Sequence, residues 1–131
     1  MLMLDRIVEL EPRRSARAHK CVSYSEPWFQ GQPSDSLMLP PVLCLEAISQ
    51  LMCVLACASD AMTPEHQIFV LAGAEKVKFR HSVVPGDQMA VSVTVIEQRA
   101  NIWKCQGRVY VQDTLCVEAV LLAAVQGRNG D

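Results

Sequence analysis

A carboxylate and an amide stand one helical turn apart in the most apolar part of the chain. Glu46 and Gln50 lie in "LPPVLCLEAISQ", where leucine, isoleucine and cysteine surround them. Glu46 is a candidate for proton chemistry, because apolar surroundings penalise the charged form of a carboxyl group. The plain alternative is a structural hydrogen bond inside a subunit interface, because a buried carboxylate needs a partner. The pattern leaves both interpretations open.

The preceding segment, "WFQGQPSDS", has the composition of a loop and carries further polar side chains. The amide of Gln32 forms hydrogen bonds but does not accept a proton near neutral pH. Asp35 and Ser36 are possible sources of a base, although solvation of a loop explains both residues better. Pro40 and Pro41 suit the first turn of a helix, where a missing N–H costs least. The polar loop should therefore lead into a helix N terminus.

The apolar run after the prolines predicts a helix over residues 41–59 that stops before Pro64. Glu46 near its centre argues against a membrane span, because a carboxylate in hydrocarbon is costly. We expect a helix buried on nearly all sides of a soluble domain. On a 3.6-residue period, one face carries Val42, Leu45, Ile48, Met52 and Leu55, and another carries Leu43, Glu46, Gln50, Cys53 and Cys57.

The rest of the chain has the pattern of strands. Residues 2–10 and 16–24 read as short strands joined by a turn at 12–14. Four longer segments rich in Val and Ile follow at 68–79, 88–99, 102–112 and 115–125, separated by turn residues. The fold class is therefore α+β: a single domain over residues 1–131, with a long antiparallel sheet of five or six strands around one central hydrophobic helix.

Composition narrows the partners and the compartment. The net charge of −2 gives no reason to expect nucleic acid or an acidic membrane. The six cysteines lack zinc-site spacing, and no secretory signal precedes them, which favours reduced thiols in the cytoplasm over a disulfide framework. A chain of this size buries only about 65% of the surface it exposes when unfolded, which leaves surface for an oligomer.

The basic residues Lys76, Lys78 and Arg80 alternate along one predicted strand and should therefore share one face. This stripe could steer an acidic partner, and a solvated strand face explains it almost equally well. The three histidines, His19, His66 and His81, fall outside the segment that should face Glu46. We expect them at the surface rather than in a catalytic role.

Several segments together resemble a known family. "MLDRIVELEP", "SEPWFQG", "LPPVLCLEAISQ", "LAGAEKVKFRHSVVPGDQM", "IWKCQGRVYVQ" and "EAVLLAAV" are similar, in order and nearly in spacing, to the small 3-hydroxyacyl-acyl-carrier-protein dehydratases of the FabZ and FabA type. The resemblance spans essentially the whole chain. It implies a hotdog fold that dimerises edge to edge, with each site built from both subunits. It also implies an acyl chain in a tunnel at the dimer interface, delivered on a phosphopantetheine arm.

The resemblance also shows two departures from the family's active-site pattern. Aligned from Phe29, the catalytic histidine position falls on Gln32, and the glycine whose N–H holds the thioester oxygen falls on Pro41. Proline has no N–H to donate. The family's catalytic carboxylate is retained as Glu46. We assign substrate contact to Phe29, Gly31 and Gln50, although ordinary core packing explains Phe29 better.

Two functions remain open at this point. The first is a protein that binds acyl thioesters, or the non-catalytic half of a dehydratase heterodimer in which the partner supplies the histidine and Glu46 completes the site. The second is a thioesterase or altered dehydratase that uses Glu46. In both, the acyl group is carried by acyl carrier protein or coenzyme A, with Lys76, Lys78 and Arg80 as the carrier-docking residues. Neither function needs a metal or a redox cofactor.

Overall fold

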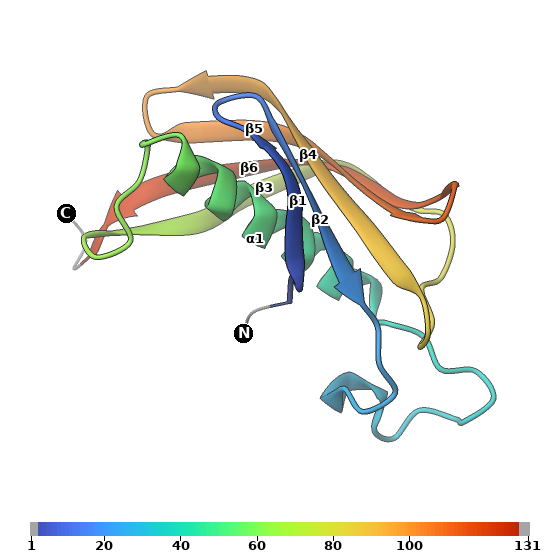
Figure 1. Ribbon diagram of the computed structural model, residues 1–131. Helices are drawn as coiled ribbons and strands as arrows, with labels where there is room; N and C mark the ends of the chain where they lie inside the picture. Colours follow the sequence, from blue (N-terminus) through green and yellow to red (C-terminus); the bar gives the residue numbers. More distant parts are fainter. Residues whose placement is uncertain (1–2, 129–131) are drawn as a thin grey trace.

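A six-stranded antiparallel sheet curls around one long helix in the computed structural model, which describes residues 3–128 (Figure 1). The sheet order is β1-β2-β4-β5-β6-β3, so β1 and β3 form its two edges. This arrangement confirms the α+β hotdog architecture. The elements are β1 (Arg6–Glu11), β2 (Ser15–Cys21), the 3₁₀ helix η1 (Pro27–Phe29), α1 (Pro41–Ala58), β3 (Gln67–Phe79), β4 (Gln88–Arg99), β5 (Ile102–Val111) and β6 (Thr114–Gly127).

Helix α1 begins at Pro41, as predicted, and ends at Ala58, one residue earlier than predicted. Ser59 terminates it: its backbone N–H donates to the Leu55 carbonyl at 3.0 Å, and its Oγ donates to the same carbonyl at 2.6 Å. The Arg13 backbone N–H donates to Ser59 Oγ at 2.8 Å. The turn between β1 and β2 is thereby tied to the end of the helix.

The helix is less buried than predicted. Val42 is 64% exposed and Glu46 is also exposed, so the expectation that the helix is buried on nearly all sides is wrong for a single chain. The physical reason is that a single sheet covers only one side of a helix. The buried side consists of Cys44, Ala47, Ile48, Leu51, Met52, Leu55 and Ala56.

By length and hydropathy α1 resembles a membrane span, with a mean hydropathy of 1.9. However, 39% of that window is buried inside the protein, and the buried residues pack against the concave face of the sheet. A core helix explains these observations without a membrane.

The strand predictions are accurate in the second half of the chain and less so at the start. Strand β4 has the predicted bounds, 88–99. The first strand begins at Arg6, because Met3 and Leu4 enter the core; Leu2, in the predicted strand, lies outside the described residues. Strand β2 ends at Cys21 rather than at 24, because the chain turns there and leaves Tyr24 70% exposed.

The helix lies close to the sheet at Gly107 in β5. A Cβ atom at this position would lie 2.3 Å from Cγ2 of Ile48. Ile48 is fully buried, and its Cγ2 is attached directly to Cβ, so it has little room to yield. The absence of a side chain at residue 107 therefore lets α1 sit close to the strand.

We predict that Gly107→Ala lowers the free energy of unfolding by about 1–3 kcal/mol, the usual cost of forcing an extra methyl group into a packed core. Urea unfolding followed by circular dichroism measures this change. Gly73→Ala is the matched control, because a Cβ there meets nothing within 4 Å. Equal stabilities of the two variants would contradict this account of the helix–sheet contact.

Candidate functional site

The segment between β2 and α1 projects from one end of the sheet and carries Gln32 (Figure 1). The Gln32 side chain folds back onto this loop. Its Nε2 donates to the carbonyl of Trp28 at 2.8 Å and to that of Met38 at 3.1 Å. Its Oε1 accepts the backbone N–H of Met38 at 3.0 Å. Gln32 therefore holds the two sides of the loop together.

This bonding gives Gln32 a structural role. The amide side chain offers two donors and an acceptor on one planar group, and all three are used by the backbone of the loop. A neutral imidazole offers one donor and one acceptor on different sides of its ring, so histidine could not reproduce these three bonds. Gly31, at φ 84°, supplies the left-handed conformation of the turn before Gln32.

A nearly buried ion pair attaches the start of the loop to the sheet. Lys20 in β2 is 8% exposed, and its Nζ donates to the carboxylate of Glu26. The other oxygen of Glu26 accepts the backbone N–H of Ser23 at 3.2 Å. The sequence pattern does not predict this pair. The only signal in the sequence is that a lysine occupies one of the alternate positions of this strand, and the other residues at those positions are buried.

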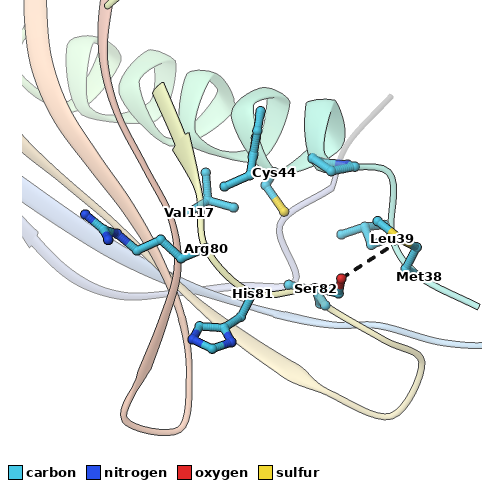
Figure 2. Close-up of a pocket in the computed structure, with 10 residues that line it drawn as sticks. Met38, Leu39, Cys44, Arg80, His81, Ser82 and Val117 are labelled. Atoms are coloured by element: carbon cyan, nitrogen blue, oxygen red, sulfur yellow. Dashed lines mark hydrogen bonds between the residues drawn. The ribbon is translucent and has the colours of Figure 1, made fainter. Parts of the chain in front are cut away.

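A cavity of about 160 Å³ lies where the loop meets the N terminus of α1 (Figure 2). Its walls are mainly apolar. Pro41 lies in its lining, and proline has no backbone N–H to offer there. The lining residues are Met38, Leu39, Pro41, Cys44, Phe79, Arg80, His81, Ser82, Val83 and Val117.

Two residues of this cavity carry reactive groups that the sequence analysis did not place there. His81 follows β3 and lines the cavity, but its ring is turned away from the Cys44 sulfur in Figure 2. Burial raises the pKa of the Cys44 thiol to about 12, with a smaller contribution from Cys116. Cys44 is therefore a neutral thiol near pH 7, and its own properties do not favour a nucleophile.

Glu46 and Gln50 are adjacent on α1, as the spacing predicts, and Gln50 Nε2 donates to Glu46 Oε1 at 3.3 Å. Gln50 Oε1 accepts the backbone N–H of Met3 at 2.7 Å. Glu46 is exposed in the single chain, so the expectation that apolar neighbours would desolvate it is wrong there. It lies on the side of α1 that the sheet leaves open and is accessible to another molecule.

The other residues assigned to substrate binding have different surroundings. Phe29 is 5% exposed and belongs to the hydrophobic core. Gly31 is exposed in the loop. No cluster of three or more potential metal-ligating side chains occurs within residues 3–128.

A cluster of cations surrounds Glu118 on the outer face of the sheet. Arg80 pairs with this carboxylate at 2.9 Å, and Lys78 and Arg108 each lie 3.9 Å from it. Arg108 also belongs to this cluster. The alternating pattern of β3 could not predict this, because Arg108 lies on β5. Three cations around one carboxylate leave this surface positive.

Lys76 is not part of this arrangement. Glu75 pairs with Val120 and Lys78 pairs with Glu118, so β3 uses three residues where β6 uses two. Lys76 has φ 53° in the resulting bulge. The prediction that Lys76, Lys78 and Arg80 share one face is wrong, because a bulge breaks the strict alternation of side chains.

A family model described as a FabA-like domain matches residues 1–120. The chain belongs to the FabA-like family. Its curated relatives include two named 3-hydroxyacyl-acyl-carrier-protein dehydratase FabZ. The one from Sorangium cellulosum is 40% identical over 129 residues, which is 98% of this chain and 83% of the relative. The one from Nitratidesulfovibrio vulgaris is 37% identical over 128 residues, with the same coverage.

Solved structures agree with the fold. The dehydratase heterocomplex ApeI:P from Xenorhabdus doucetiae contains a chain that matches with a TM-score of 0.79 at 14% identity, over 98% of this chain and 86% of that one. At this identity the likeness concerns the fold alone. In this chain residue 32 is a glutamine and residue 41 is a proline.

We predict that Gln32→Ala lowers the free energy of unfolding by about 2 kcal/mol, because three hydrogen bonds of roughly 0.5–1.5 kcal/mol net each are lost. Amide hydrogen exchange should also become faster in residues 28–38. Urea unfolding and exchange mass spectrometry measure the two effects. Gln30→Ala, in the exposed part of the same loop, is the control, and an equal response of both variants would disprove the clamp.

The surroundings of Glu118 give a pH dependence. The hydrogen bond from Arg80, followed by the charges of Arg80, Lys78 and Arg108, holds the pKa of Glu118 below its ordinary 4.5. A lowered pKa in the folded state stabilises the protein above the ordinary value and is lost as pH falls through the folded value. The stability gap between native protein and Glu118→Gln, measured by urea unfolding, should be present at pH 7 and shrink below pH 4.5. A gap that is constant or wider in acid would contradict this.

Proposed function

We propose that this protein binds acyl thioesters, does not dehydrate 3-hydroxyacyl thioesters alone, and acts as the non-catalytic subunit of a dehydratase heterodimer. The observation that carries the proposal is the bonding of Gln32, whose side-chain N–H groups and oxygen all bond the backbone of its own loop. The residue at the position of the family's base is therefore both chemically unable to take a proton and occupied elsewhere.

Dehydration of a 3-hydroxyacyl thioester requires a base for the C2 proton, an acid for the departing hydroxyl group, and a donor for the thioester oxygen. Loss of a general base typically costs about 10²–10⁴-fold in rate. Loss of one oxyanion donor costs about 3 kcal/mol more. With Gln32 and Pro41 in these positions, little of the rate enhancement would remain.

The open side of α1 and the edge of β3 support association with another chain. Val42 is 64% exposed on the helix, and Leu71 and Phe79 are 43% and 52% exposed on the edge strand. Exposed apolar residues beside an unpaired strand edge favour pairing with a second sheet. A homodimer would satisfy this surface equally well, but would contain no histidine at either copy of residue 32.

A heterodimer explains why Glu46 is retained. It is exposed on the open side of α1, where a second subunit would lie. A dehydratase-like partner with an intact histidine would face Glu46 and complete one active site, while the site containing Gln32 would stay silent. The existence of a dehydratase heterocomplex with this fold is compatible with such pairing.

Carrier recognition is proposed for the cations around Glu118. Lys78, Arg80 and Arg108 form a positive surface that would attract an acidic acyl carrier protein through interactions weakened by salt. Lys76, at the bulge, would be peripheral to it. Coenzyme A is the alternative carrier. Neither carrier requires a metal or redox cofactor. We also place the protein in the cytoplasm.

The test is turnover of a 3-hydroxyacyl thioester by the purified protein, with products identified by mass spectrometry. We expect no loss of water from the native protein alone. Dehydration should appear in a mixture with a FabZ-type subunit in which the partner's own catalytic carboxylate has been replaced. Glu46→Gln in the mixture should then abolish it, because Glu46 is the only intact carboxylate left for the composite site.

Gln32→His with Pro41→Gly should restore partial activity to the protein alone, whereas Gln30→His with Pro33→Gly, in the same loop, should not. Dehydration by the native protein alone would overturn the proposal and indicate a substitute base. Release of free acid, abolished by Glu46→Gln, would instead establish the thioesterase function. Failure of the native chain to rescue the carboxylate-deficient partner would overturn the heterodimer.

A further inference from the structure

The short segment before β1, from Met3 to Asp5, connects helix α1 with strand β2. At one end, the backbone N–H of Met3 donates to Gln50 Oε1 at 2.7 Å. At the other end, the backbone N–H of Asp5 donates to the carbonyl of His19 at 2.9 Å. The Oδ2 atom of Asp5 also accepts the backbone N–H of Cys21 at 2.6 Å. The segment is therefore fixed to the helix and to the sheet.

The bond from Met3 decides which way round the Gln50 amide stands. A glutamine side chain ends in an oxygen and an NH₂ group, and these exchange places when the amide flips. Because the Met3 N–H is a donor, it selects the oxygen and directs the NH₂ group to the other side. There Gln50 Nε2 donates to Glu46 Oε1 at 3.3 Å. The flipped amide would place its oxygen against the carboxylate and its NH₂ group against the backbone N–H.

We infer that the backbone N–H of Met3 is a positioning group for Glu46, acting through the orientation of the Gln50 amide. This inference assigns Gln50 to the positioning of a carboxylate rather than to substrate contact. It rests on the proposed function for the use that is made of Glu46. The orientation of the amide follows from its contacts with Met3 and Glu46, whichever ligand the protein binds.

Glu46 needs such a restraint because it is exposed on the open side of α1. An exposed side chain changes rotamer within picoseconds to nanoseconds when nothing holds it. The hydrogen bond from Gln50 occupies one carboxylate oxygen, and the other can act on a substrate in a site that a second subunit completes. Since misplacing a catalytic group by about 1 Å can cost about 100-fold in rate, this restraint matters for the reaction.

A buried ion pair keeps the far end of the segment in place. Lys20 is 8% exposed, and its Nζ lies 3.9 Å from Asp5 Oδ1. The same Nζ donates to the carboxylate of Glu26 at the start of the loop before α1. Asp5 is thus held by β2 through both backbone and side-chain contacts, and the Met3 N–H two residues earlier has a defined position relative to the sheet.

The first measurement is NMR spectroscopy of the full chain. A nuclear Overhauser effect between the Gln50 Nε2 protons and the Glu46 γ protons reports the orientation of the amide, and we expect it in the native protein. Met3→Pro removes the N–H and should weaken this signal by roughly half or more. Leu4→Ala removes a buried neighbouring side chain and keeps the Met3 N–H, so it should leave the signal unchanged. An unchanged signal in Met3→Pro, or an equal loss in Leu4→Ala, would overturn the inference.

The second measurement leaves the segment itself unaltered. Gln50→Met keeps the length of the side chain but offers no amide oxygen, so the Met3 N–H should exchange with deuterated water about tenfold faster. The Asp5 N–H, which is bonded to the carbonyl of His19, is the internal control and should keep its rate. The inference fails if Met3 exchanges equally fast in both proteins, or if Asp5 accelerates to the same extent.

The third measurement is the rate of dehydration in the mixture with a carboxylate-deficient FabZ-type subunit. Met3→Pro should lower kcat about tenfold and leave KM within about twofold, because a misplaced catalytic group affects the reacting step more than binding. Adding Gln50→Met should cause little further loss, because both changes release the same carboxylate. A full additional loss in the double variant, or a change confined to KM, would contradict a positioning role.

These measurements distinguish the positioning role from the proposed function. If the NMR and exchange results are as expected but the mixture does not dehydrate, the positioning of Glu46 stands and the heterodimer function fails. If the mixture dehydrates through Glu46 while Met3→Pro leaves kcat unchanged, the proposed function stands and the positioning role fails.

Discussion

The structure depends on the packing of one apolar helix against one curved sheet. Ile48 fills the space left by the missing side chain of Gly107, which brings α1 close to β5. That contact buries one side of the helix and necessarily leaves the other side uncovered, since the chain has a single sheet. The exposed Val42 and Glu46 are consequences of this geometry. An apolar helix with an open side favours a second subunit, and the retained carboxylate lies where that subunit would be.

The loop before α1 is held together by the side chain of Gln32. Gln32 lacks the basicity of histidine, but its planar amide joins Trp28 and Met38 through three hydrogen bonds. The substitution therefore stabilises a defined loop rather than leaving a gap. Pro41 acts similarly: it removes an N–H donor, yet it suits the first turn of α1. Both residues are compatible with a stable scaffold that binds without completing the reaction.

Periodic patterns predicted the regular elements well and the irregular ones poorly. The bounds of α1 and β4 follow from runs of apolar residues and from turn residues at their ends, which act locally. The position of Lys76 did not follow, because the bulge in β3 depends on pairing with β6. The cation cluster at Glu118 was also out of reach, since Arg108 joins it from another strand. Strand register brings such residues together, and a single strand does not encode it.

The sequence by itself determined the family, the helix-wrapped sheet and the chemical identities of residues 32, 41 and 46, which are an amide, a proline and a carboxylate. These conclusions follow from residue chemistry, which does not depend on conformation. Only the tertiary structure decided that the Gln32 amide bonds Met38 and that Glu46 faces away from the sheet. Those properties depend on the directions of side chains in a loop without periodicity, and on which side of α1 one sheet covers.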